Sequence, residues 1–138
     1  MNIDFKIAVF DLDNTLWNGE ELYSETIDIL EYLKNKNVFL YIASYHQDAL
    51  SVCRNLNILK YFDGILYGTE QTKLEMINII KANHVNDETE IVFFDDNMTN
   101  IRLVRDNSKV HCIYVGRCGL SSYHLIYLKE IEAKQDSS

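Results

Sequence analysis

The most regular feature of the chain is a set of five short apolar segments separated by longer, mixed ones. Each apolar segment is continuous rather than alternating and is rich in Val, Ile, Phe or Tyr, which is typical of strands covered on both faces, as in a parallel sheet. The segments predict strands at residues 7–10, 38–43, 64–67, 91–94 and 110–115.

Helical spacing fills the intervals between these strands. Apolar residues recur at i, i+3, i+4 and i+7 from Ala49 to Leu56, and a similar pattern runs from Leu120 to Ile131. Ser121, near the start of the second pattern, is a candidate helix cap. Weaker patterns occupy the other intervals. The predicted helices cover residues 24–36, 49–56, 74–80, 98–104 and 120–131.

The order of the elements, a strand and then a helix repeated five times, predicts an α/β fold. Right-handed crossovers then give a three-layer αβα sandwich, a Rossmann-like, doubly wound fold with a mostly parallel five-stranded sheet. We expect one domain over residues 1–133, because 138 residues can bury a core without disulfide or structural-metal support. A polar tail at residues 134–138 is expected to fray.

Cysteine content, hydropathy and net charge indicate the expected location and partners of the protein. Three irregularly spaced cysteines, with no charged-then-apolar leader before Ile7, favour an intracellular, cytoplasmic protein with reduced thiols. No apolar run approaches the roughly 20 residues of a membrane-spanning helix, so we expect no membrane association. The formal net charge of −8 would repel a nucleic-acid backbone and argues against a polynucleotide partner. The sequence gives no indication of the oligomeric state.

Polar side chains follow three of the predicted strands at the point where each strand ends. Because parallel strands end at one edge of a sheet, where open α/β sheets bind ligands, we expect these side chains to converge. They are Asp11, Asp13, Asn14 and Thr15 after the first strand, Ser44, Tyr45 and His46 after the second, and Asp95 and Asp96 after the fourth.

The four carboxylates at this edge imply a bound cation. A single D-x-D or a single acidic pair would be ordinary turn or helix-start chemistry, but four carboxylates together repel one another unless a cation or a shared proton offsets the repulsion. All-oxygen ligation favours Mg²⁺, which is usually held by one or two carboxylates, waters and substrate phosphate. Lys73 lies near a predicted helix start, where a cation is unfavourable, which suggests an anion nearby.

Four motifs resemble those of the haloacid-dehalogenase (HAD) superfamily of phosphatases. The segment FDLDNTLW, from Phe10 to Trp17, resembles the D-x-D-x-T signature, and FFDD, ending at Asp96, resembles the fourth motif. Ser44 matches the second motif and Lys73 the third, in the right order and spacing. The T-L-W and F-F-D-D variants are similar to the magnesium-dependent phosphatase subfamily. The resemblance spans residues 7–115 and implies the HAD core fold.

The resemblance implies a role for each acidic residue. Asp11 would attack a phosphate monoester in line and form an aspartyl-phosphate. Asp13 would protonate the leaving alkoxide and then deprotonate the water that hydrolyses the intermediate. The Asp11 carboxylate, the Asp13 backbone carbonyl and Asp96 would hold Mg²⁺. Asp95 would orient Lys73, whose charge stabilises the transition state, although the choice between Asp95 and Asp96 as direct ligand stays open.

The resemblance also implies a substrate-binding set. Ser44 and the backbone N–H of Tyr45 would hold phosphoryl oxygens. Leu12 and Thr15 complete the set, Thr15 by fixing the turn after the nucleophile.

Neither of the family's usual insertion points has room for a cap domain. Only about seven residues, 17–23, separate the first motif from the first helix, and a helix and a strand use up the chain between Ser44 and Lys73. We therefore expect an open site in which a bulky substrate or a neighbouring subunit excludes water. Trp17, Tyr45 and His46 are expected on its rim, with core packing the other interpretation for Trp17.

The predicted function is Mg²⁺-dependent hydrolysis of phosphomonoesters, either phosphoproteins or small phosphates such as sugar phosphates. Two further enzyme activities on the same core stay open, namely a polynucleotide 3′-phosphatase and a transferase acting on a carrier-linked substrate. A receiver-like phosphorylated signalling module is the non-enzyme alternative. Receivers carry the phosphorylated Asp at the third strand, where this chain has Tyr67, Gly68 and Thr69.

Overall fold

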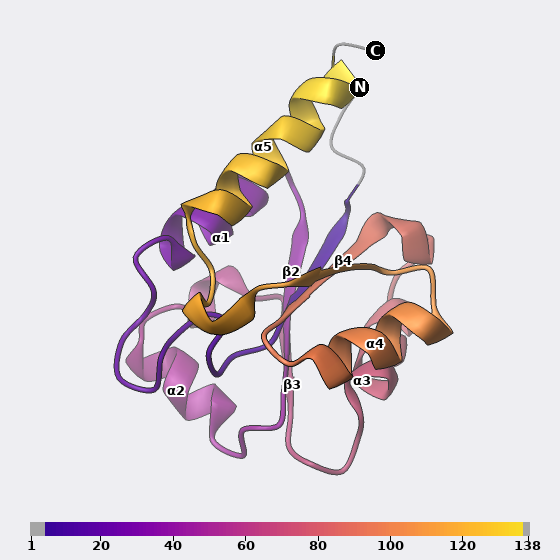
Figure 1. Cartoon of the computed structure of the whole chain (residues 1–138). Coiled ribbons are helices and arrows are strands. Elements are labelled where there is room, and N and C mark those ends of the chain that lie inside the picture. Colours follow the sequence, from indigo (N-terminus) through magenta and orange to yellow (C-terminus); the bar gives the residue numbers. More distant parts are fainter. Residues whose placement is uncertain (1–4, 137–138) are drawn as a thin grey trace.

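The computed structural model describes residues 5–136 and their side chains as far as residue 131. Its five strands form one parallel sheet in the order β3-β2-β1-β4-β5, with helices on both faces (Figure 1). The strands are β1 (Ile7–Phe10), β2 (Phe39–Ser44), β3 (Gly64–Tyr67), β4 (Ile91–Asp95) and β5 (His111–Tyr114). The helices are α1 (Thr26–Asn35), α2 (Ala49–Asn55), α3 (Lys73–Ala82), α4 (Met98–Asn107) and α5 (Ser122–Asp136). The predicted fold class is confirmed.

Each face of the sheet has its own apolar core. Helices α1, α2 and α5 cover one face, where Ile29, Leu30 and Leu33 of α1 pack against side chains such as Phe10 and Leu40. Helices α3 and α4 cover the other face, on the opposite side of the sheet in Figure 1. The central strands β1 and β4 are buried along their whole length, which explains why their sequences read as continuous apolar runs.

The helix ends show where local chemistry refines the predicted boundaries. Helix α3 begins one residue earlier than predicted, because Thr72 and Glu75 form a reciprocal capping box around its first turn. Ser121 lies just before α5, where its backbone N–H donates to Nδ1 of His124 and its carbonyl accepts from the His124 N–H. Residues 134–136, expected to belong to a frayed tail, continue α5, and residues 137–138 lie outside the described part of the chain.

Strand register brings the acidic motifs together. Phe10 pairs with Phe94 across β1 and β4, and the two rings stack with centroids 4.7 Å apart. The next residues on these strands are Asp11 and Asp95, and the Asp11 N–H donates to the Phe94 carbonyl at 2.9 Å. The strand order reverses beside β1, so both carboxylates lie at the switch point where open α/β sheets bind ligands.

The connections at this edge are short. Between β1 and α1 the chain folds back on itself through bridges that join Trp17 to Asp13 and to Leu22. Between β2 and α3 it forms α2, a short 3₁₀ turn and β3. Residues 5–136 therefore contain no inserted cap at either point. Within the same range, no helix has both the length and the apolar character needed to cross a bilayer.

Candidate active site

A polar cleft of about 170 Å³ opens at the carboxyl ends of β1, β2 and β4. The side chains around it include most of the site residues predicted from the sequence. They are Asp11, Asp13, Asn14, Ser44, Tyr45, His46, Asp95, Asp96, Asn97 and Asn100. Three other predicted site residues, Leu12, Thr15 and Lys73, are fully buried and lie behind the cleft.

Lys73 is the buried cation of the site. Its ammonium group lies 2.7 Å from Asp11 Oδ1 and 3.0 Å from Asp95 Oδ2, and its side chain is almost completely shielded from water. It also lies 4.9 Å from the centroid of the Tyr45 ring. A lysine at a helix start is tolerated here because two carboxylates surround it, as the sequence suggested.

These contacts shift the protonation of all three groups. Burial raises the pKa of Asp11 from 3.8 to about 6, although the ammonium of Lys73 acts in the opposite direction. Burial, and then the charge of Asp11, also raises the pKa of Asp95. Burial alone would lower the pKa of Lys73, but the two carboxylates outweigh it and raise the pKa above its ordinary value. Lys73 is therefore charged at neutral pH, and both carboxyl groups lie within hydrogen-bond distance of its ammonium.

A metal ion fits the acidic part of this cluster. Asp11, Asp95 and Asp96 each offer a carboxylate oxygen, and these oxygens lie within 4.8 Å of one another. With Lys73 included, the cluster carries a net charge of −2, which one divalent cation would neutralise. The donors are all oxygen, which is the set that Mg²⁺ prefers.

Asp95 and Asp96 differ in how many partners they already have. Asp95 Oδ1 accepts from the Asn97 N–H at 2.8 Å, and Oδ2 accepts from Asn100 Nδ2 at 3.2 Å as well as from Lys73. Asp95 is fully buried, whereas Asp96 is only partly buried and lies beside Asp11. This geometry favours Asp96 as the carboxylate with room for a metal.

The loop after β2 forms the second wall. Ser44 is 1% exposed, and its Oγ accepts from the His46 N–H at 3.0 Å, which leaves its own O–H free to donate. His46 Nδ1 accepts from the Asp48 N–H at 3.0 Å. A neutral His46 therefore carries its proton on Nε2, and this side chain lines the cleft. Tyr45 and His46 were predicted as rim residues, and both lie there.

The turn after β1 holds the remaining predicted residues. Thr15 Oγ1 donates to Asp11 Oδ2 at 3.4 Å, and the Thr15 N–H closes a turn onto the Leu12 carbonyl at 3.3 Å. The Leu12 side chain packs in the core, so only its backbone could face a ligand. Trp17 packs partly against the same core, but its Nε1–H donates to Asp13 Oδ1 at 2.8 Å.

Sequence reasoning missed two residues that support the site, Asn97 and Asn100. Asn100 bonds to Asp95, and its Oδ1 lies 3.5 Å from the Tyr45 hydroxyl. Asn97 caps α4 by accepting from the N–H groups of Thr99 and Asn100. An Asn directly after an acidic strand end is a recognisable cap signal, which could have identified Asn97. Asn100 lies inside a predicted helix and carries no such signal.

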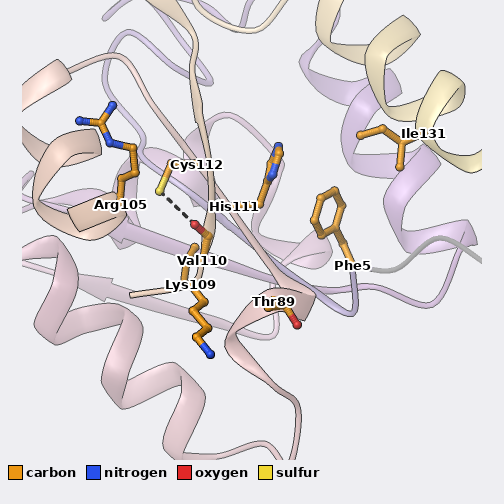
Figure 2. A pocket seen from close by; sticks show the side chains of 8 residues that line it. All are labelled: Phe5, Thr89, Arg105, Lys109, Val110, His111, Cys112 and Ile131. Atoms are coloured by element: carbon orange, nitrogen blue, oxygen red, sulfur yellow. Dashed lines mark hydrogen bonds between the residues drawn. The ribbon is translucent and has the colours of Figure 1, made fainter. Parts of the chain in front are cut away.

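A larger cavity of about 580 Å³ lies at the opposite end of the sheet, where Phe5, Thr89 and Val110 precede β1, β4 and β5 (Figure 2). Phe5, His111 and Ile131 form an apolar and aromatic side, and Arg105 lies across from them (Figure 2). No Asp or Glu is among the residues that line it. The carboxylate cleft is therefore the better candidate for the reaction centre, despite its smaller volume.

Comparison with known proteins identifies the family. A model of the acid phosphatase family matches residues 19–132. This span includes Ser44, Lys73, Asp95 and Asp96 and begins after the Asp11 motif. No curated protein sequence matches the chain.

Several solved structures share the fold at low sequence identity. The phosphatase-containing N-terminal part of a Bacteroides fragilis protein, complexed with Mg, matches with a TM-score of 0.72 and 18% identity. The match covers 93% of this chain but only 40% of that one, so the chain spans less than half of that structure.

Two further structures match over nearly their whole length. The 3-deoxy-D-manno-octulosonate 8-phosphate phosphatase of Moraxella catarrhalis, complexed with magnesium, phosphate and its sugar, has a TM-score of 0.70 and 15% identity over 98% of this chain and 91% of that one. A haloacid dehalogenase-like hydrolase of Streptococcus pneumoniae has a TM-score of 0.71 and 16% identity over 90% of this chain and 91% of that one. The predicted HAD relationship is confirmed, and the chain belongs to the acid phosphatase family of HAD-like phosphatases.

Proposed function

We propose that the protein hydrolyses phosphate monoesters with Mg²⁺ through an aspartyl-phosphate on Asp11. The observation that carries this proposal is the buried ammonium of Lys73 between Asp11 and Asp95, with Asp96 beside them. A nucleophilic carboxylate next to a fixed cation and a divalent-metal site is the arrangement needed to bring an anionic nucleophile to an anionic phosphoryl group.

The metal site would be formed by Asp11, Asp96 and the backbone carbonyl of Asp13. Bound there, Mg²⁺ would supply charge that shields the phosphoryl oxygens. Asp95 would act on Lys73 rather than on the metal, because it is fully buried and its two oxygens already accept three hydrogen bonds. The Mg-complexed structures that share the fold support this choice of ion.

The chain's own residues then account for the two half-reactions. An oxygen of Asp11 attacks phosphorus while the ester bond to the leaving oxygen breaks, and Asp13 gives that oxygen a proton. In the second half-reaction Asp13 takes a proton from water as the water oxygen attacks phosphorus and Asp11 is released. Ser44 Oγ–H and the Tyr45 N–H would hold phosphoryl oxygens, and Lys73 would stabilise their growing charge.

The substrate class follows from the open site. Asp13 and Asp96 are only partly buried, and residues 5–136 insert no cap over them. An uncapped cleft would accept a phosphorylated side chain of a protein or a small phosphate such as a sugar phosphate. The Moraxella phosphatase, complexed with magnesium, phosphate and a sugar, supports the small-phosphate alternative.

The first test is Mg²⁺-dependent release of phosphate from p-nitrophenyl phosphate. Wild type should turn over with Mg²⁺ and stop with EDTA, and Asp11→Asn should be inactive under both conditions. Asp28→Asn is the matched control, because it removes an exposed carboxylate on α1. Full activity in Asp11→Asn would contradict the covalent mechanism, and a stable phospho-Asp11 without turnover would favour the receiver-like alternative.

Substrate choice requires a second panel. A phosphotyrosine peptide, a sugar phosphate and a 3′-phosphorylated oligonucleotide should be compared by kcat/KM. We expect turnover of the peptide, the sugar phosphate or both. A strong preference for the oligonucleotide would support the 3′-phosphatase alternative instead.

A further inference from the structure

We propose that Trp17 is a positioning residue that fixes which oxygen of Asp13 carries the transferred proton. The inference rests on the proposed function, because it assigns a partner to the residue expected to act as general acid and base. It deepens that function by explaining how a partly exposed carboxyl group on a turn keeps one orientation.

The central contact is a short hydrogen bond between side chains. Trp17 Nε1–H donates to Asp13 Oδ1 at 2.8 Å. An indole N–H is only a donor, so Oδ1 must be the accepting oxygen. The acidic proton is then left to Oδ2, which is the oxygen free to exchange protons with the cleft that Asp13 lines.

The backbone holds both partners in place. Asp13 and Trp17 are joined by a β-bridge, and the Asn14 N–H donates to the Trp17 carbonyl at 2.8 Å. Asn14 takes a left-handed conformation with φ 61°, which tightens the turn between them. A second bridge ties Trp17 to Leu22. Trp17 therefore lies in a segment of the β1–α1 connection that is anchored by two bridges.

Packing fixes the indole itself. Trp17 lies against the apolar core on the α1 side of the sheet and is only partly exposed. Because packing already fixes the indole ring, its hydrogen bond to Asp13 costs little further side-chain entropy. Asp13 alone could turn about its side-chain torsions, and small errors in the position of a reacting group are costly.

The proton count shows what this orientation achieves. In the first half-reaction an Asp11 oxygen bonds to phosphorus while the bond between phosphorus and the leaving oxygen breaks. The Oδ2–H bond of Asp13 breaks at the same time, and its proton goes to the leaving oxygen. In the second, Oδ2 takes a proton from water as the water oxygen bonds to phosphorus and the bond to Asp11 breaks. Oδ1 keeps the same hydrogen bond from Trp17 in both steps.

The hydrogen bond can be observed without activity or metal, because the chain has a single tryptophan. Its indole N–H gives one cross-peak in a ¹H–¹⁵N spectrum of the metal-free protein. Asp13→Ala should move this proton upfield and speed its exchange with solvent, whereas Asp13→Asn, which keeps an accepting oxygen, should shift it less. Glu20→Gln is the matched control, since Glu20 is an exposed acid in the turn that follows Trp17. An unmoved peak in Asp13→Ala would overturn the inference.

Kinetics then separate positioning from packing. The ratio kcat/KM reports the steps up to release of the leaving group, before the intermediate is hydrolysed. Trp17→Phe should lower kcat/KM about tenfold or more on an alkyl phosphate, whose leaving oxygen needs the proton, and much less on p-nitrophenyl phosphate, whose leaving group does not. In an Asp13→Asn background the same substitution should have little further effect, because the two residues act as one unit. An equal loss of kcat/KM on both esters, or a full additional loss in the Asp13→Asn background, would show that Trp17 only packs.

A shape-matched variant guards against misfolding. If Trp17→Phe lowers the melting temperature substantially, the indole can be replaced by benzothiophene, which keeps the ring shape and lacks the N–H. This variant should show the same selective loss on the alkyl phosphate, and wild-type rates on both esters would refute the inference. If wild type hydrolyses neither ester with Mg²⁺, the proposed function fails, whereas the indole spectrum still decides whether the contact exists.

Discussion

Replacing Lys73 by Met should destabilise the metal-free protein strongly at neutral pH. Lys73 is fully buried and contacts Asp11 at 2.7 Å and Asp95 at 3.0 Å. Methionine retains an unbranched apolar side chain of similar length but leaves both carboxylates without their cation. Removing one partner from a buried ionic group costs about 3–5 kcal/mol, so we expect a loss of this size in the free energy of unfolding.

The penalty should depend on pH in a defined direction. The pKa of Asp11 is about 6 in the folded protein and 3.8 in an exposed chain, so the folded state favours the protonated acid and loses stability as pH rises through this window. Without Lys73 the folded-state pKa values of Asp11 and Asp95 should rise further. The destabilisation of Lys73→Met should therefore be largest above about pH 6 and should shrink as the carboxylates become protonated.

Urea unfolding of metal-free protein at pH 7.5 and at pH 5 measures both effects. Lys81→Met is the matched control, because Lys81 pairs with Glu88 at 2.6 Å but both side chains are partly exposed. An exposed pair contributes about 0–1 kcal/mol, so this control should remain close to wild type. Adding Asp95→Asn to Lys73→Met should restore part of the stability. A Lys73→Met protein within about 1 kcal/mol of wild type at pH 7.5, or an equal penalty at both pH values, would refute the reasoning.

Three further predictions follow from other parts of the structure. A metal must displace the proton from Asp11, so the Mg²⁺ affinity measured by calorimetry should fall about tenfold per pH unit below about pH 6. A constant affinity from pH 5 to 7 would contradict the raised pKa of Asp11. Asn97→Ala should lower the unfolding free energy by about 1 kcal/mol in thermal or urea melts, since it removes the cap of α4, and no change would argue against that cap. Gly119→Ala should lower the unfolding free energy by about 2–4 kcal/mol in the same melts, because Gly119 has φ +64° and a Cβ would lie 2.1 Å from the Tyr23 ring. An unchanged melt would mean that the Tyr23 ring moves aside easily.

Much of the fold could be predicted because burial leaves a direct trace in the sequence. Segments such as Ile7–Phe10 and Ile91–Asp95 are buried on both faces of the sheet, and only continuous apolar runs satisfy such positions. The helix limits were less exact, because capping hydrogen bonds rather than periodicity decide where α3 begins.

The candidate site also has a part that the sequence predicted and a part that it did not. The β-α alternation predicted that the strand ends would share one edge of the sheet, and strand order and register then place Asp11 beside Asp95. The partners chosen by each side chain could not be predicted, because they depend on rotamers and on packing across elements far apart in sequence. Asn100 bonding to Asp95, and Trp17 bonding to Asp13, are both of this kind. The assignment of nucleophile, proton donor and metal ligands stays a prediction.

The most direct test of the account is to detect the phosphoryl group on Asp11. Asp13→Asn should slow the hydrolysis step and let the intermediate accumulate when the protein is mixed with Mg²⁺ and p-nitrophenyl phosphate and quenched in acid. Peptide mass spectrometry should then find a phosphate on the peptide that contains Asp11, labile to hydroxylamine, and none in Asp13→Asn protein that also carries Asp11→Asn. A phosphate on another residue, or substrate turnover by wild type with no phosphorylated peptide under any quench condition, would contradict Asp11 as the nucleophile.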